Sequence, residues 1–437
     1  MPSPDPTTTL GFEDALWAAS DLLRGRLDPA IYKHAVLEVL YRKAIGGDGW
    51  AADLLSAPPP DLARLELAPG ILASLVALID DVALGPDAHD TLGRVYEYFL
   101  GRFASAEGRG GGEFYTPPCV VQLLVSLLDP IAGTVYDPCC GSGGMFVQAQ
   151  LGRGGLRCHG QESNPRTFKL AQRNLTLRGL DFDLGPGPAD TLHQDLHPDL
   201  RADHVLANPP FNIARWGAAQ LAGDPRWAFG EPPDRCANFA WIQHILHHLA
   251  PMGTGGVVLA NGSLSATTSG EGALRGALVA ADVVEAIVAL PDRLFYATQI
   301  PACIWVLARG KASDSHRDRS GEVLFVDATR LGRMETRVHR VLDAPDVARI
   351  AQALHRWRDA SGAFTPEPGF CASATLDQVA AQGGVLTPGR FVGAPPPNTE
   401  QQAPDLGGLV AKLRLQMAQA RASDEDLEAA LHALARD

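Results

Sequence analysis

A strand that runs into a glycine turn and then into a helix constrains the fold of this chain more than any other feature. The segment reads Val135-Tyr136-Asp137-Pro138-Cys139-Cys140-Gly141-Ser142-Gly143-Gly144-Met145-Phe146. Glycines let the backbone pass close to a ligand at the carboxyl ends of parallel strands. About eighteen residues after Gly144, a second predicted strand ends at Glu162, whose carboxylate can accept hydrogen bonds from both ribose hydroxyls of a nucleoside. The two features predict a nucleoside cofactor. The turn is not G-x-G-x-x-G and has no P-loop lysine, so dinucleotides and triphosphates fit less well.

The spacing of apolar residues divides the chain into three regions. Residues 1–107 show helical spacing, broken at Pro58-Pro59-Pro60, and this predicts an all-helical N-terminal domain. In residues 108–340, short β-branched runs alternate with helical stretches, which predicts an α/β domain with a mostly parallel, Rossmann-like sheet and helices on both faces. Residues 341–437 return to a helical pattern and end in a tail of about 404–437. The expected strands are Thr134 to Asp137, Leu156 to Glu162, His204 to Ala207, Val257 to Ala260, Val283 to Leu290 and Cys303 to Leu307.

A second motif, Ala207-Asn208-Pro209-Pro210-Phe211, follows the third of these strands and would lie at the same edge of the sheet as the glycine turn. An exocyclic amine on a nucleobase is a weak nucleophile because its lone pair is delocalised into the ring. Methylating it therefore takes hydrogen-bond acceptors that draw the nitrogen towards tetrahedral geometry. The Asn208 side-chain oxygen and the Pro209 carbonyl can supply two acceptors, and Phe211 offers a face on which a flipped base can stack.

With these motifs the chain resembles amino-directed DNA methyltransferases that use S-adenosylmethionine, and specifically the modification subunits of type I restriction-modification systems. The resemblance extends over most of the chain. Its further matching segments are Leu16-Trp17, Leu23-Arg24-Gly25, Tyr32-Lys33, Gly93 to Tyr98, Asn238-Phe239-Ala240-Trp241, Leu290-Pro291 with Phe295, and Thr298-Gln299-Ile300-Pro301. One departure is Ala260-Asn261-Gly262, where the family usually has proline before the asparagine.

The resemblance implies a role for each motif. The catalytic turn is Asn208, Pro209, Pro210 and Phe211. S-adenosylmethionine would be bound by Glu113, Phe114, Tyr115, Thr116, Pro117 and Pro118 at its methionine end, by Asp137, Gly141, Ser142, Gly143 and Gly144 of the glycine turn, by Glu162 at the ribose and by Asp190 near the adenine. Asp183 and Asp195 lie in the same acidic segment as Asp190 and remain alternatives for the last role. No metal is expected.

By this resemblance, the chain transfers a methyl group from S-adenosylmethionine to N6 of a flipped adenine in double-stranded DNA. A separate specificity subunit would read the DNA site, with two modification subunits beside it, and a restriction subunit can belong to the same system. The formal net charge of −13 agrees with this division of labour, because it gives the chain no long-range attraction to DNA. The tail offers an attachment point, because Leu406, Val410, Leu413 and Met417 form one helical stripe.

The start of the sequence has no secretory signal and no window is apolar enough to span a membrane, so we expect a cytoplasmic protein without membrane partners.

Three other functions remain open. A stand-alone DNA methyltransferase could act on adenine N6 or cytosine N4, although asparagine in the catalytic turn favours adenine. Protein glutamine methyltransferases share an N-P-P-aromatic turn but resemble only the central domain. A catalytically silent scaffold is disfavoured by the intact Asp137, Glu162, Asn208 and Phe211.

Other residue groups indicate structure rather than chemistry. Cys139 is expected to be small apolar filler rather than a nucleophile. We interpret His244, His247 and His248 as surface and groove histidines of an amphipathic helix, without a metal. Four arginines would share one face if their segment were helical, where they could contact phosphate or simply be solvated: Arg330, Arg333, Arg337 and Arg340.

Overall fold

The computed structural model describes residues 23, 29–80, 116–151, 155–296, 298–312, 316–362, 364–394, 414, 416 and 417. The chain divides into two compact units, residues 1–393 and 394–437. Glu113, Phe114 and Tyr115 lie outside the described residues, as does all of the predicted docking stripe except Met417. Within the described residues, no helix is both long and apolar enough to cross a membrane.

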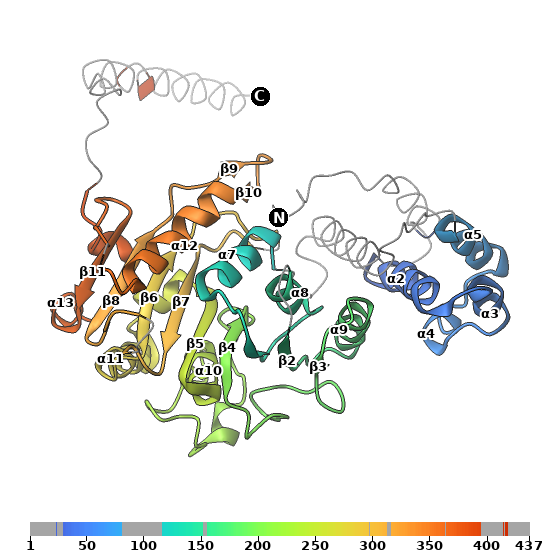
Figure 1. Ribbon diagram of the computed structural model, residues 1–437, viewed down its shortest axis with the longest axis horizontal. Coiled ribbons are helices and arrows are strands. Elements are labelled where there is room, and N and C mark those ends of the chain that lie inside the picture. Colours follow the sequence, from blue (N-terminus) through green and yellow to red (C-terminus); the bar gives the residue numbers. More distant parts are fainter. Residues whose placement is uncertain are drawn as a thin grey trace, which may run out of the picture. The chain divides into compact units, whose positions relative to one another are not determined.

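A nine-stranded sheet forms the centre of the larger unit, in the order β11-β8-β6-β7-β5-β4-β1-β2-β3 (Figure 1). The first five strands along the chain, β1 to β5, pair in parallel with one another, and β6 pairs in parallel with β8. Two strands run antiparallel to their neighbours, β7 between β5 and β6, and β11 beside β8. This confirms the predicted mostly parallel α/β sheet. The strands are β1 (Gly133–Asp137), β2 (Leu156–Gly160), β3 (Phe182–Asp183), β4 (Ala202–Ala207), β5 (Leu249–Ala260), β6 (Val284–Ala289), β7 (Ala302–Ala308), β8 (Glu322–Asp327) and β11 (Cys371–Thr375).

Helices cover both faces of the sheet, as predicted. One apolar core contains Val258 of β5, and the opposite core contains its neighbours Val257 and Leu259, because successive side chains of a strand point to opposite faces. Both faces are therefore buried, as expected for a parallel sheet. The first core is completed by α7 (Pro118–Leu128), α8 (Gly144–Gln150), α9 (Pro165–Leu177) and α12 (Ala344–Arg358). The second is completed by α10 (Asn238–His248), α11 (Glu271–Ala280) and α13 (Leu376–Ala381). Short 3-10 helices lie at η2 (Ala218–Leu221), η3 (Asn261–Leu264), η4 (Thr268–Gly270) and η5 (Pro388–Arg390).

Residues 29–80 form helices, as the apolar spacing predicted. The break expected at the triple proline falls between α3 and α4, and Pro60 begins α4, where a missing amide donor costs nothing. Leu170 and Leu177 of α9 contribute to the apolar core of these helices. The helices are α2 (Pro29–Gly46), α3 (Trp50–Ser56), α4 (Pro60–Ala63) and α5 (Pro69–Asp80).

The region after residue 340 departs from the helical prediction. Helix α12 and strand β11 both belong to the sheet domain, with Trp357 and Phe370 buried in its first core. The sheet also continues past Leu307 into β8. Strand β11 reads Cys-Ala-Ser-Ala-Thr, which has little intrinsic strand preference, so its conformation comes from pairing with β8 rather than from local sequence.

The segment with the four arginines is not helical either. It forms a short hairpin of β9 (Arg333–Met334) and β10 (Arg340–Val341). Arg333 pairs with Asp343 at 3.1 Å and Arg340 with Asp292 at 3.5 Å, so two of the four arginines already have carboxylate partners. The proposed common helical face is therefore wrong.

Candidate active site

The predicted motifs gather at one edge of the sheet. Strands β1, β2, β4 and β5 are parallel neighbours, so their carboxyl ends meet at this edge. Asp137 ends β1, Glu162 follows β2, Asn208 follows β4 and Asn261 follows β5. A ligand at this edge lies where open α/β sheets bind their ligands.

The glycine turn has the backbone geometry that its sequence indicates. Gly141 and Gly143 adopt φ angles of 56° and 81°, in the left-handed region that favours glycine. A Cβ on Gly143 would lie 3.1 Å from the Leu175 side chain, whereas a Cβ on Gly141 or Gly144 would have open space around it. The Ser142 carbonyl accepts a hydrogen bond of 2.9 Å from the buried Asn174 of α9, which fixes the turn against that helix.

Glu162 connects the glycine turn to the next helix. One carboxylate oxygen accepts a hydrogen bond from Gly141 N at 3.1 Å, and the other accepts from Asn164 N at 2.7 Å. Asn164 is the N-cap of α9, where its side chain accepts hydrogen bonds from two backbone amides. Glu162 is therefore held directly beside the turn, where the spacing of the sequence predicted it.

Asp137 is buried beneath the turn. Its Oδ1 accepts a hydrogen bond of 3.0 Å from Cys139 N. Burial raises the pKa of the Asp137 carboxyl to about 7, the hydrogen bond from Cys139 opposes this rise, and the negative charge of Glu162 adds to it. A buried carboxyl that titrates near neutrality is suited to a positively charged ligand, which would stabilise its ionised form.

Asp190 follows a residue that is bonded to the backbone of Glu162, and its side chain is as exposed as that of Asp183. The adjacent Ala189 donates its backbone amide to the Glu162 carbonyl at 3.0 Å, and the Asp190 side chain is 60% exposed. Asp195 is instead paired with His248 at 2.9 Å, and Asp183 lies on β3 with Oδ1 bonded to Gly185 N. Asp190 also has partners, Leu192 N at Oδ1 and His193 Nδ1 at Oδ2, both at 3.1 Å, so only the backbone link through Ala189 to Glu162 favours it over its two alternatives.

The side-chain amide of Asn208 has a hydrogen-bond partner at its nitrogen but not at its oxygen. Its Nδ2 donates a hydrogen bond of 2.7 Å to Thr116 Oγ1, directly before α7. Its Oδ1 is buried without a hydrogen-bond partner among the described residues. Burying an acceptor without a partner costs about 1–3 kcal/mol, so the arrangement is unfavourable until a donor arrives. The contact with Thr116 spans 92 positions and could not be read from the sequence.

An aromatic pair stands beside this turn. Phe211 meets Phe295 edge to face, with ring centroids 5.5 Å apart and planes at 75°. Beyond Phe211, Asn212 N donates to Asn238 Oδ1 at 3.1 Å, while Asn238 Nδ2 donates to Asn212 Oδ1 at 2.9 Å. This reciprocal pair fixes the end of the catalytic turn to the start of α10. Asn238 and Phe295 lay in segments matched by resemblance, but only the structure gives them a position at the site.

Asn261 presents a second unsatisfied amide at the same edge. Its backbone amide donates to the Pro301 carbonyl at 2.9 Å, and its Oδ1 is also buried without a partner among the described residues. The residue before it is alanine, yet η3 still forms directly after β5. The missing proline therefore leaves this turn intact.

The interpretation of the histidines as surface residues is wrong. His244 and His248 are fully buried, and His247 is half-buried. His244 bonds to Tyr136 Oη at 3.0 Å through Nε2 and to Arg226 Nη1 at 3.1 Å through Nδ1. Because the guanidinium can only donate, His244 Nδ1 accepts and the ring is neutral. Burial lowers the pKa of His244 well below its usual value.

His248 meets an acceptor at each ring nitrogen. Nδ1 lies 3.1 Å from the Leu200 carbonyl and Nε2 lies 2.9 Å from Asp195 Oδ2, so both ring nitrogens have a partner. Burial alone would raise the pKa of Asp195, but the hydrogen bond and charge of His248 outweigh it and hold that pKa well below its usual value. We call Tyr136, Asp195, Arg226, His244 and His248 the buried histidine network.

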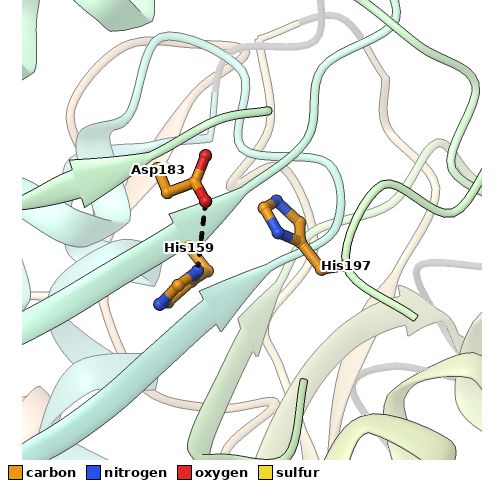
Figure 2. Close-up of side chains that lie close together, drawn as sticks. All are labelled: His159, Asp183 and His197. Carbon is orange, nitrogen blue, oxygen red and sulfur yellow. Dashed lines mark ion pairs between the residues drawn. The ribbon is translucent and has the colours of Figure 1, made fainter. Parts of the chain in front are cut away.

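Among the residues that the structure describes, two groups of side chains have the composition of metal ligands. Asp195, His244 and His248 form one, but their ligand atoms already take part in the hydrogen bonds of the network. Figure 2 shows the other, in which His159 of β2, Asp183 of β3 and His197 point towards one another. His197 Nε2 is bonded to the Gly160 carbonyl, and His159 Nδ1 lies 3.9 Å from Asp183 Oδ2. Neighbouring ligand atoms of tetrahedral zinc lie about 3.4 Å apart, so these side chains would have to move closer to hold zinc.

Cys139 does not have the properties of a nucleophile. It is half-buried and packs against the two parts of the core that contain Tyr136 and Trp241. Burial raises the pKa of its thiol well above the ordinary value, and the charge of Asp137 adds to the rise. A protonated thiol at this position agrees with the expected role as filler.

The assembled edge fits the expected cofactor and chemistry. The open side of the glycine turn, the buried Asp137 and the adjacent Glu162 suit a positively charged nucleoside. The unsatisfied Asn208 Oδ1 suits a donor such as an amine. The glycine turn and the catalytic turn lie at the carboxyl ends of the adjacent strands β1 and β4.

The sequence also matches known proteins. The profile of the family described as N-6 DNA Methylase matches residues 87–400. The chain is 49% identical to the type I restriction enzyme HindI methylase subunit of Haemophilus influenzae, over 70% of this chain and 69% of that protein. It is 38% identical to the type I restriction enzyme MjaIX methylase subunit of Methanocaldococcus jannaschii, over 73% of this chain and 59% of that protein.

The fold matches a solved structure of the same kind. The crystal structure of the type I restriction-modification system methyltransferase subunit from Streptococcus thermophilus superimposes with a TM-score of 0.69 and 24% identity, covering 88% of this chain and all of that chain. At this identity the likeness concerns the fold.

Proposed function

Because the chain belongs to the N-6 DNA methylases, among the methylase subunits of type I restriction enzymes, we propose that it methylates N6 of an adenine flipped out of double-stranded DNA. The observation that supports this most strongly is the buried, unpartnered Oδ1 of Asn208 beside the Pro209 carbonyl, among the residues that the structure describes. An amine with two N–H groups can satisfy both acceptors at once. Chemistry and family thus point to the same substrate group.

The cofactor, S-adenosylmethionine, supplies an electrophilic methyl group when bound. Asp137 would face its positively charged methionine part, Glu162 the ribose hydroxyls and Asp190 the adenine, with the backbone of Gly141 and Gly144 leaving room for the ligand. Residues 113–118 would cover the methionine end. The glycine turn and the catalytic turn are adjacent at the sheet edge, so the methyl group and the amine would be brought together there.

Asn208 and Pro209 then act on the amine. By accepting its two hydrogens, Asn208 Oδ1 and the Pro209 carbonyl favour a tetrahedral nitrogen whose lone pair is available for attack. S-adenosylmethionine, held by Asp137, Glu162 and the glycine turn, would supply the methyl group to this nitrogen, which would lose one proton in exchange. Phe211 stacks on the base, and Phe295 supports Phe211 from its edge.

The proposal includes a separate specificity subunit that reads the DNA site, flanked by two copies of this chain. The net charge of −13 gives the chain no long-range attraction to DNA, so another protein has to hold it there. The apolar stripe of Leu406, Val410, Leu413 and Met417 is the proposed docking element. Removing residues after Gln402 should abolish co-purification with the partner and leave S-adenosylmethionine binding unchanged. Co-purification of the shortened chain would show that docking uses another surface.

Mass spectrometry of nucleosides tests the proposed reaction. The chain is co-expressed with its specificity subunit in cells without DNA methylation, and the genomic DNA is digested and compared with DNA from an Asn208→Ala strain. We expect N6-methyladenine that depends on Asn208 and on the partner. N4-methylcytosine would overturn the adenine substrate, and methylated glutamine in protein would overturn the DNA substrate. Robust site-specific methylation without the partner would overturn the need for a specificity subunit.

A further inference from the structure

The Asn208 amide has to keep one orientation to work. If the amide were turned by half a rotation, its NH2 group would face the incoming amine, and two donors would oppose each other. In the structure, Nδ2 is engaged by Thr116 Oγ1 at 2.7 Å, and Oδ1, on the other side of the amide carbon, is left without a partner among the described residues. This bond, made through Nδ2, goes with the orientation in which Oδ1 is free to accept, and it fixes the place of the amide beside Thr116.

Thr116 is itself held by a rigid element. Pro117 is the N-cap of α7, and its carbonyl accepts hydrogen bonds from Val120 N at 2.9 Å and Val121 N at 3.1 Å. Eight of the eleven residues of α7 are buried in the first core. The Thr116 hydroxyl is thus attached to the core of the domain, which gives it little freedom to follow the Asn208 side chain.

We propose that Thr116 is a positioning residue for methyl transfer and acts through Asn208. This inference rests on the proposed function, and it changes the role of Thr116, to which the resemblance gives a part in cofactor binding. Thr116 directly follows Glu113, Phe114 and Tyr115 of the expected cofactor segment. The segment that covers the cofactor would thereby also set the acceptor that activates the substrate.

Thr116→Val tests this proposal because valine has the shape of threonine without the hydroxyl. With the chain in complex with its co-expressed specificity subunit, kcat for methylation of unmodified genomic DNA should fall by roughly ten- to a hundredfold, the cost of a small misplacement of a reacting group. The dissociation constant of S-adenosylmethionine, measured by calorimetry, should change by less than about twofold. Thr116→Ser should recover most of the lost rate, because it restores the acceptor.

A double-mutant cycle separates positioning from general damage. If Thr116 acts through Asn208, adding Thr116→Val to Asn208→Ala should lower the rate no further. Thr176→Val, on the exposed side of α9, is the matched control and should leave rate, affinity and melting temperature unchanged.

The outcomes distinguish this inference from the proposed function. If the unmodified complex forms no N6-methyladenine, the proposed function fails. If it does form N6-methyladenine but Thr116→Val reacts at the normal rate, or loses cofactor affinity at unchanged kcat, only the positioning role of Thr116 is overturned. An additive effect in the double mutant overturns it as well. If Thr116→Val does not fold, Thr116→Ala also lacks the hydroxyl and takes its place, with the same expected and contradicting results.

Discussion

The catalytic turn and the buried histidine network both contain buried polar atoms, but they differ in how their hydrogen bonds are completed. In the network, His244 and His248 each have partners at both ring nitrogens, supplied by Tyr136, Arg226, Asp195 and a backbone carbonyl. In the catalytic turn, Asn208 Oδ1 has none among the described residues. The complete network has the properties of structure, and the incomplete turn has the properties of a binding site.

The difference has an energetic reading. A buried acceptor without a donor lowers stability by about 1–3 kcal/mol, and no interaction within the folded chain offsets this cost. Such a group is explained when a substrate supplies the donor, so that the interaction is made during the reaction. In the network, buried polar side chains stabilise the fold because every donor meets an acceptor.

The largest expected effect is a loss of stability when a residue of the buried histidine network is replaced. Arg226 is 6% exposed and bonds to Asp224, to His244 and to the carbonyls of Thr191 and Leu192. Arg226→Met should lower the free energy of unfolding by about 3–5 kcal/mol, because it leaves buried partners without a donor. Urea unfolding measures this, with Arg166→Met on the exposed face of α9 as the control. A stability loss under about 1 kcal/mol, the size of an exposed ion pair, would contradict the structural role.

The opposite result is expected at the catalytic turn. Asn208→Ala should lower the methylation rate about a hundredfold or more, because an acceptor used mainly in the transition state is lost. The free energy of unfolding should change by less than about 1 kcal/mol, because the lost hydrogen bond to Thr116 is offset by the removal of a buried unsatisfied acceptor. Both are measured on the purified complex, by single-turnover transfer and by urea unfolding. A large loss of stability would place Asn208 with the network instead.

A smaller effect is expected at the cofactor half of the site. Glu162→Ala should weaken S-adenosylmethionine binding by about 1.5–3 kcal/mol, the range for hydrogen bonds to a charged group. Calorimetry on the chain measures the affinity, and melting temperature reports whether the turn that Glu162 supports has remained folded. Unchanged affinity with the fold intact would move the ribose contact to another acid.

The smallest effect is a dependence of affinity on pH. Burial raises the pKa of Asp137 to about 7, so without cofactor its carboxyl is protonated below that pH and ionised above it. A positively charged cofactor binds the ionised form, so affinity should rise between about pH 6 and pH 8 and fall by up to about tenfold per unit below about pH 7. Calorimetry at several pH values checks this, and Asp137→Asn should flatten the profile. A profile equally steep in that variant would assign the dependence to another group.

Local sequence predicted the parts of the site that local sequence determines. The glycine turn, Glu162 and the catalytic turn each follow a strand that the sequence predicted. Parallel pairing then brings these ends to one edge, so their meeting followed from the predicted fold.

Contacts between distant segments could not be predicted in this way. Strand β11 forms because β8 offers an edge to pair with, not because its small residues favour a strand. His244 and His248 looked like polar positions of an amphipathic helix, and only the positions of Arg226 and Asp195 show that they are buried. The hydrogen bond from Asn208 to Thr116 is of the same kind, because nothing near either residue indicates the other.

The most direct test of the central claim is a structure of this chain with its specificity subunit, target DNA and the unreactive analogue S-adenosylhomocysteine. The measurement is the distance from Asn208 Oδ1 to N6 of the target adenine. The account predicts a flipped adenine with that distance at about 2.7–3.2 Å, the range of an N–H···O hydrogen bond. A flipped base whose amine lies elsewhere, with Asn208 Oδ1 still unpaired, would contradict it.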